Sequence, residues 1–133
     1  MTGVEVLPLG PERIVAIDGR PDPAALGGFV CLRLGEAEYM LLGATVTDLP
    51  PAGDVLAVDV GDAWEGWSVA GPGAADFLAR ICALDLAGFA PGAAVRTAMG
   101  GIAVLLRRIG ETSWELRVER SYAGWFEAWL RAP

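Results

Sequence analysis

The sequence predicts an α+β fold, in which two main helices cover one face of a mostly antiparallel sheet. Three observations lead to this prediction. Apolar stretches of about four to eight residues, separated by Gly, Pro and acidic residues, recur along the chain and indicate strands. Two segments instead repeat their apolar residues with helical spacing. The length of 133 residues suits one domain with its own core, so we expect a single domain over 1–133.

The chain up to residue 70 is predicted to consist mainly of strands. Gly10-Pro11 separates the first two strands and suggests a hairpin. Asp22 is placed to cap a short helix. Gly35-Glu36 separates another two strands, again as in a hairpin. In order, the strands expected here span 4–9, 13–18, 29–34, 39–42, 55–60 and 66–70.

The first main helix is expected over 71–82. Gly71 suits the N-cap, and Pro72 suits the first helical position, where no backbone N–H is needed. Arg80 falls on the polar side. The residues spaced at i, i+3, i+4, i+7 and i+8 form one apolar face, which we expect to pack into the core. They are Ala74, Phe77, Leu78, Ile81 and Cys82.

The last third of the chain is predicted to form a three-stranded meander and a second main helix. The strands are expected over 93–97, 102–109 and 114–119, with a Gly-Gly pair in the first turn. Ser121 caps the helix. Its apolar face has the same helical spacing and is mostly aromatic. It consists of Tyr122, Trp125, Phe126, Trp129 and Leu130.

The composition excludes several kinds of active site. The chain has no His, Lys, Asn or Gln, and all ten basic residues are Arg. A Ser-His-Asp or Cys-His site and an imidazole metal ligand are therefore impossible. A Schiff-base lysine and a P-loop lysine are equally excluded. We expect no catalytic, cofactor-binding or metal-binding residues in this chain.

Net charge and hydropathy restrict the kinds of binding partner and the cellular compartment that we expect for this protein. The net charge of −7 argues against nucleic acid, which binds basic surfaces. Arg107-Arg108, the one adjacent basic pair, is expected on a strand with one side chain on each face. Hydrophobic residues make up 53% of the chain, yet no run approaches the ~20 apolar residues that span a bilayer. The N-terminal segment does not resemble a signal peptide. We therefore expect a cytoplasmic protein that binds no membrane.

The two cysteines, Cys31 and Cys82, lie far apart in the sequence and show no metal-binding or redox spacing. A disulfide between them is not expected in the cytoplasm. Both occur in apolar patterns, so both are predicted to pack in the core as small hydrophobic side chains.

Several segments resemble the gamma subunit of heterotetrameric sarcosine oxidase. The segment 71–97 has that family's helix-loop pattern, and 57–64 is close to its "VDVSDAW". The segment 34–43 is similar to its "LGPDEWLLLG". The resemblance covers 33–131 and is most specific over 57–131, so we divide the domain into a divergent half, 1–54, and a family-like half, 55–133. Further matches are Arg96-Thr97, Val104-Leu105-Leu106, Arg108, Glu115-Leu116, Val118, Arg120 to Ala123, and Trp129-Leu130.

The resemblance implies a fold and a function. The fold is related to domain 1 of the folate-binding region of aminomethyltransferases (glycine cleavage T-protein) and their YgfZ-like relatives. The gamma subunit supports oxidative demethylation of sarcosine without supplying catalytic groups. It packs onto the alpha subunit, and the FAD, FMN, NAD and folate sites belong to the alpha and beta subunits. Similar subunits occur in N-methylglutamate dehydrogenase-like complexes, and the sequence does not separate the two.

The related enzymes use residues that this chain lacks. Aminomethyltransferases carry an Asp near "GGIIDD", where this chain has apolar Ala103-Val104. An apolar side chain cannot take the proton that a carboxylate takes. The "KGCYxGQ" motif of the YgfZ type is also absent. These differences favour a chain that kept the fold without the chemistry.

Three residues are candidates for a partner interface. Trp64 and Trp67 are three apart on an expected strand and should point to opposite faces, so interface and core remain equally open for this pair. Arg96 could anchor a partner through its guanidinium, or form an internal salt bridge to Asp85 or Asp59. The remaining tryptophans, Trp114, Trp125 and Trp129, are expected in the core.

The sequence therefore favours a non-catalytic accessory subunit of a sarcosine oxidase-like complex, with alpha-type and beta-type subunits as partners. The isolated chain is expected to expose an apolar patch or to self-associate. One alternative is a free-standing folate or small-molecule binding module that has lost its catalytic residues. Such a module could form a homodimer. A hydrolase or transferase is the third and least favoured interpretation.

Overall fold

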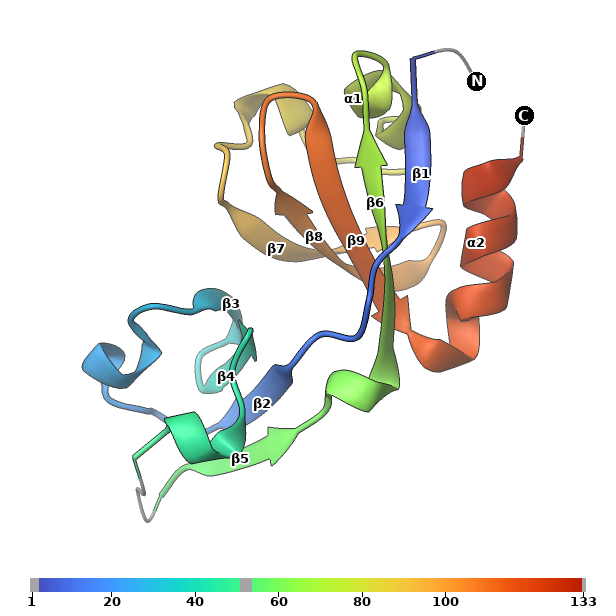
Figure 1. Ribbon diagram of the computed structural model, residues 1–133. Helices are drawn as coiled ribbons and strands as arrows, with labels where there is room; N and C mark the ends of the chain where they lie inside the picture. The colour runs from blue at the N-terminus through green and yellow to red at the C-terminus, as the bar shows by residue number, and fades with distance from the viewer. Residues whose placement is uncertain (1–2, 51–53, 133) are drawn as a thin grey trace. The chain divides into compact units, whose positions relative to one another are not determined.

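The computed structural model describes residues 3–50 and 54–132. The chain forms two compact units, each built around its own antiparallel sheet (Figure 1). The first unit comprises Met1–Gly10 and Trp64–Pro133, and the second comprises Pro11–Ala63. The predicted α+β character with mostly antiparallel sheet is thus confirmed, but the strands form two sheets.

The first unit contains a five-stranded sheet in the order β1-β6-β9-β8-β7. The three-stranded meander predicted near the C-terminus is present as β7, β8 and β9. The strand β6 joins it by pairing antiparallel with β9 along its whole length. The strands are β1 (Glu5–Pro8), β6 (Trp64–Ala70), β7 (Ala94–Met99), β8 (Ile102–Arg108) and β9 (Ser113–Glu119).

One face of this sheet carries the core of the first unit. Trp67, Leu116 and Leu106 stand opposite one another on three neighbouring strands, so they share that face. Residues of α1 (Ala74–Leu78) and α2 (Ala123–Arg131) join the same buried cluster. Aromatic rings link these layers: Trp67 lies 5.7 Å from Phe126, and Phe77 stacks on Trp129 at 5.3 Å between ring centroids.

The first predicted helix is much shorter than expected. Of the predicted segment 71–82, only Ala74–Leu78 is α-helical. The prediction of two main helices on one face is therefore not confirmed, and α2 is the one main helix of the described residues. The chain beyond Leu78 tightens, because Arg80 N–H donates to the Phe77 carbonyl and Ile81 N–H to the Leu78 carbonyl, three residues back. The predicted inner face of the segment 71–82 is nevertheless correct, because Phe77 and Leu78 are buried while Arg80 is exposed.

The helix α2 begins close to the predicted position, directly after the short 3-10 helix η5 (Arg120–Tyr122). Phe126 and Leu130 are buried as expected, whereas Tyr122 is 47% exposed and Trp125 is 54% exposed. The prediction that Trp125 packs in the core is therefore wrong. The aromatic face spans more of the helix circumference than the sheet covers, so its margin remains at the surface.

The second unit contains a four-stranded sheet in the order β3-β4-β2-β5. Val15, Ile17 and Leu41 are buried on one face together with Ala44. Its strands are β2 (Ile14–Asp18), β3 (Val30–Gly35), β4 (Glu38–Leu42) and β5 (Leu56–Asp59). Short 3-10 helices lie between β2 and β3, between β4 and β5, and after β5: η1 (Pro23–Leu26), η2 (Val46–Asp48) and η3 (Gly61–Ala63). A further one, η4 (Leu86–Gly88), lies in the first unit.

One of the two predicted hairpins is correct. The strands β3 and β4 pair across a short turn. The hairpin expected around Gly10-Pro11 is wrong, because β1 pairs with β6 of the first unit while β2 pairs with β4 and β5 of the second. Gly10-Pro11 is therefore the point where the chain passes from one unit to the other.

Two further expectations concern exposure. Cys82 is buried as predicted, but Cys31 is exposed on β3, so its prediction as a core residue is wrong. Alternation along β3 explains the difference, since the neighbouring Leu32 is the buried residue.

Across 3–50 and 54–132, no helix is both long enough and apolar enough to cross a membrane.

Candidate functional site

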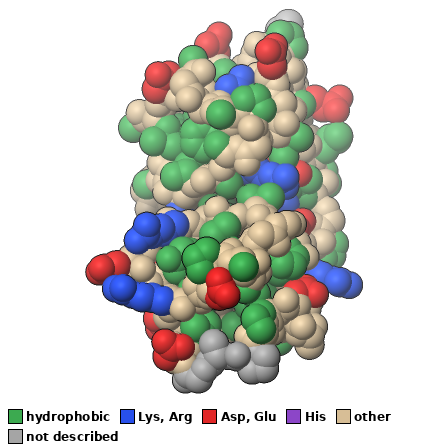
Figure 2. Space-filling model, turned by 90° about the vertical axis from the view of Figure 1, so that its left-hand side faces the viewer, with side chains coloured by type: hydrophobic (Ala, Val, Ile, Leu, Met, Phe, Trp, Pro, Cys, Tyr) green, Lys and Arg blue, Asp and Glu red, His purple; other side chains and the backbone are tan. Residues whose placement is uncertain are grey.

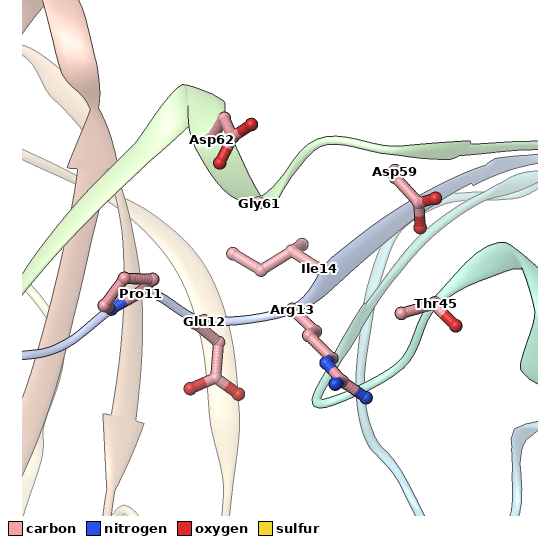
Figure 3. A pocket seen from close by; sticks show the side chains of 8 residues that line it. All are labelled: Pro11, Glu12, Arg13, Ile14, Thr45, Asp59, Gly61 and Asp62. Atoms are coloured by element: carbon pink, nitrogen blue, oxygen red, sulfur yellow. The ribbon is translucent and has the colours of Figure 1, made fainter.

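A hollow of about 340 Å³ lies within the second unit, between the start of β2 and the end of β5 (Figure 3). The segment from Pro11 to Ile14 forms one wall, and Thr45 and Asp59 come from the opposite side. Gly61 is required here, because a Cβ at this position would lie 2.3 Å from the Glu12 carbonyl oxygen. The complete lining is Pro11, Glu12, Arg13, Ile14, Thr45, Asp59, Gly61 and Asp62.

The polar groups of this hollow mainly stabilise the local chain. Asp59 Oδ1 accepts a hydrogen bond from Val46 N–H at 3.0 Å, which ties η2 to β5. Thr45 N–H donates to Asp48 Oδ2 at 2.8 Å in a capping box at the start of η2. In Figure 3 the carboxylates of Glu12 and Asp62 lie well apart and do not converge on a common point.

The chemistry of the hollow is correspondingly limited. It presents three carboxylates, one guanidinium and one hydroxyl, with no thiol or imidazole among the lining residues. Within the part of the chain that the structure describes, no group of three or more potential ligands is arranged to hold a metal ion. The hollow could accept a small polar molecule, but it lacks a nucleophile held beside a base.

The three residues predicted for an interface differ in their burial and surroundings. Trp67 is 2% exposed, on the core face of β6, where it packs against Phe126. A side chain buried in this way cannot touch a partner directly, so Trp67 serves the core. Trp64 lies three residues earlier on β6, on the other face, and is half-buried. Arg96 is exposed on β7 and forms no ion pair with Asp85 among the described residues.

The face of the first sheet opposite its core carries a cluster of charged side chains. Arg117 is 4% exposed, and its Nη2 lies 3.2 Å from Glu115 Oε1. Arg107 Nη1 lies 3.7 Å from the same carboxylate oxygen. Arg108 points to the other face, as predicted, and its guanidinium lies 5.1 Å from the Trp114 ring centroid. Sequence reasoning missed the buried Arg117, because a single Arg in a strand is usually solvated.

Among residues 3–50 and 54–132, six large hydrophobic side chains are substantially exposed. Figure 2 shows one face of the molecule, on which hydrophobic side chains gather between separate charged ones. Among the exposed set, Leu56 is 63% exposed and Val58 is 46% exposed, and both belong to the edge strand β5. The sequence of 55–60 is apolar at every position but Asp59, so it does not say which side of the strand is covered. The others are Leu7, Ile109, Tyr122 and Trp125.

Comparison with known proteins identifies the fold. No protein-family model and no curated protein matches the chain. A chain of the heterotetrameric sarcosine oxidase from Corynebacterium sp. U-96, solved in complex with pyrrole 2-carboxylate, has a TM-score of 0.83 and 23% identity. The alignment covers 96% of this chain and 81% of that chain. The fold is similar to that of this sarcosine oxidase chain. At this level of identity the likeness concerns the fold.

The predicted kinship with aminomethyltransferases is also confirmed for the fold. The glycine cleavage system aminomethyltransferase T from Bartonella henselae has a TM-score of 0.70 and 14% identity. The alignment covers 96% of this chain and 45% of that one, so this chain spans less than half of that enzyme. The sarcosine oxidase chain is the better match in both TM-score and length.

Proposed function

We propose that this chain is a non-catalytic accessory subunit of a sarcosine oxidase-like complex. The observation that carries the proposal is the fold likeness, with a TM-score of 0.83 over 96% of this chain, to a chain of heterotetrameric sarcosine oxidase. The residue set gives further support, because the chain contains no His or Lys. The position of the aminomethyltransferase carboxylate is occupied by Ala103-Val104, which lies on β8.

The proposal assigns the chemistry to other subunits. An alpha-type subunit, together with a beta-type subunit, would hold FAD, FMN, NAD and folate and would oxidise the N-methyl amine. This chain would contribute shape and buried surface, as interfaces between subunits require. The exposed apolar residues of the described surface are consistent with such a role. A cytoplasmic location follows from the same proposal.

The proposal is tested by co-expressing the chain with the alpha-type oxidase subunit of the same organism. We expect the two to co-purify as a stable complex. Because Arg96 is exposed, Arg96→Ala should weaken the complex if Arg96 is a polar anchor, while Arg80→Ala, a second exposed arginine, serves as the control. A chain that remains monomeric and ignores the alpha-type subunit would contradict the accessory role.

The hollow beside Asp59 supports one alternative, a free-standing small-molecule or folate-binding module. Its volume of about 340 Å³ lies at the small end of the range for ligand sites. Isothermal titration of the isolated chain with folate separates the two functions. Saturable folate binding that Asp62→Ala abolishes, in a chain that does not bind the alpha-type subunit, would favour the module.

A further inference from the structure

The strand β5 is an open edge of the second sheet. It is the outermost strand in the order β3-β4-β2-β5 and, among the described residues, pairs only with β2. An open edge leaves backbone N–H and C=O groups free to pair with another strand. The direction of these groups follows from one hydrogen bond beside the strand.

Val60 N–H donates to the Ile14 carbonyl at 2.8 Å, and Val60 stands opposite Ile14 in the register of β5 and β2. In an antiparallel pair, residues that exchange hydrogen bonds alternate with residues that do not. The backbone groups of Leu56 and Val58 therefore point inward to β2. Those of Ala57 and Asp59 point outward, and no backbone or side-chain group in the described chain is bonded to them.

The side chains make this edge apolar. Leu56 and Val58 are two residues apart, so they project from the same face, and they are 63% and 46% exposed. Asp59 is the last residue of the strand and Asp54 lies two residues before its first, and both are also exposed. The edge thus presents two outward-facing residues of backbone, two apolar side chains on one face and an acidic group at each end.

By comparison, the edge strand β1 of the first sheet is guarded, in the sense that its outward backbone groups are hindered from pairing with a further strand. Leu9 N–H donates to the Gly66 carbonyl, so by the same alternation Val6 and Pro8 direct their backbone groups outward. Pro8 has no N–H to offer, and the Val6 carbonyl accepts a hydrogen bond from Arg131 Nη1 at 3.4 Å. Natural sheets block their edges with such features, and β5 has neither.

We infer that β5 receives an extended segment of the partner subunit, which adds a strand to the second sheet. This inference rests on the proposed function. The outward backbone of Ala57 and Asp59 requires an extended partner, and Leu56 and Val58 require apolar side chains at alternate positions of that partner. The acidic ends favour basic residues flanking the apolar ones.

A second copy of this chain is a poorer occupant. Each copy carries a net charge of −7, and pairing two β5 strands would bring four carboxylates, from Asp54 and Asp59 of both copies, to one edge. Like charges at a contact oppose association. Charge complementarity therefore selects a different, basic partner segment.

The test measures binding of the alpha-type subunit to two pairs of matched variants. Ala57→Pro removes an outward N–H and leaves the β2 ladder intact, whereas Ala94→Pro removes an outward N–H from the edge strand β7. Leu56→Glu places a charge on the open edge, and Leu7→Glu places one at a similarly exposed leucine on the guarded strand β1. We expect Ala57→Pro and Leu56→Glu to weaken binding about tenfold or more, and the two controls to change it less than about threefold.

Hydrogen exchange on the wild-type chain gives a readout that does not depend on the variants folding. The amides of Ala57 and Asp59 should exchange rapidly in the isolated chain and become protected, by about tenfold or more, in the complex. This measurement decides the question if Ala57→Pro proves too unstable to purify. Denaturation midpoints of all four variants show which of them retain the fold.

The outcomes separate this inference from the proposed function. If the wild-type chain does not bind the alpha-type subunit, the proposed function fails and the inference fails with it. If the wild-type chain binds while Ala57→Pro and Leu56→Glu bind equally well, the accessory role stands and the β5 assignment is overturned. Protection of Ala57 and Asp59 that rises with the concentration of the isolated chain would show a second copy at this edge and would also overturn the assignment.

Discussion

At the scale of a single residue, Phe77 links the helices α1 and α2 of the first unit. Its side chain is 3% exposed, and its ring stacks on Trp129 of α2. Phe77→Ala should lower the free energy of unfolding by about 3–5 kcal/mol, because it leaves a cavity between α1 and α2. Arg80→Ala, on the exposed side, should cost less than about 1 kcal/mol. Equal urea midpoints for the two variants would contradict this packing.

The two cysteines differ in access to solvent. Cys31 is exposed and Cys82 is buried. The fold still covers part of Cys31, and this partial desolvation raises the pKa of its thiol above the ordinary value. Iodoacetamide should therefore modify Cys31 alone in the folded chain. Because the thiolate is the reactive form, the reaction should be slower than that of free cysteine at pH 8 and should accelerate as the pH rises through the raised pKa. Mass spectrometry after timed alkylation checks both statements, and modification of Cys82 at the same rate would refute them.

At the scale of the element, two glycines have opposite roles. Gly71 ends β6 with φ of +120°, and a Cβ there would lie 2.1 Å from the Gly3 carbonyl oxygen. Gly71→Ala should cost more than about 2 kcal/mol, because it adds a clash to a backbone conformation that favours glycine. Gly124 lies in α2 with open space at its Cβ position, so Gly124→Ala should stabilise the chain by about 0.5–1 kcal/mol. Thermal unfolding of both variants tests the signs, and a stabilising Gly71→Ala would show that the turn differs from the one described.

At the scale of the whole molecule, the proposed role predicts an inactive isolated chain. The purified chain, free of flavin subunits, should neither oxidise sarcosine nor transfer an aminomethyl group. The reason is chemical: the chain has no His or Lys, and apolar Ala103-Val104 stands where the resemblance to aminomethyltransferases places a carboxylate. Assays for formaldehyde and hydrogen peroxide provide the measurement, with the reconstituted complex as the positive control. Steady turnover by the isolated chain would contradict the accessory role.

The spacing of apolar residues and turn residues correctly predicted those parts of the fold whose contacts join segments close together in the sequence. The helical spacing of Phe77 and Leu78 correctly predicted which side of the first helical segment is buried. The short apolar segments and the Gly-Gly turn between the first two of them predicted the meander β7-β8-β9, whose strands pair with their neighbours in sequence. The three-residue spacing correctly placed Trp64 and Trp67 on opposite faces of β6. Periodicity reports faces because side-chain direction is fixed by the backbone repeat.

The sequence by itself thus determined the α+β class, the buried side of the first helical segment, and the absence of histidine and lysine chemistry. Only the tertiary structure decided that β1 leaves its neighbour β2 and pairs with β6, some sixty positions away. It also decided that Trp125 and Cys31 are exposed and that β5 lies at an open edge. The physical reason is that strand pairing and exposure depend on which distant segments supply hydrogen bonds and cover, and a local pattern does not contain that information.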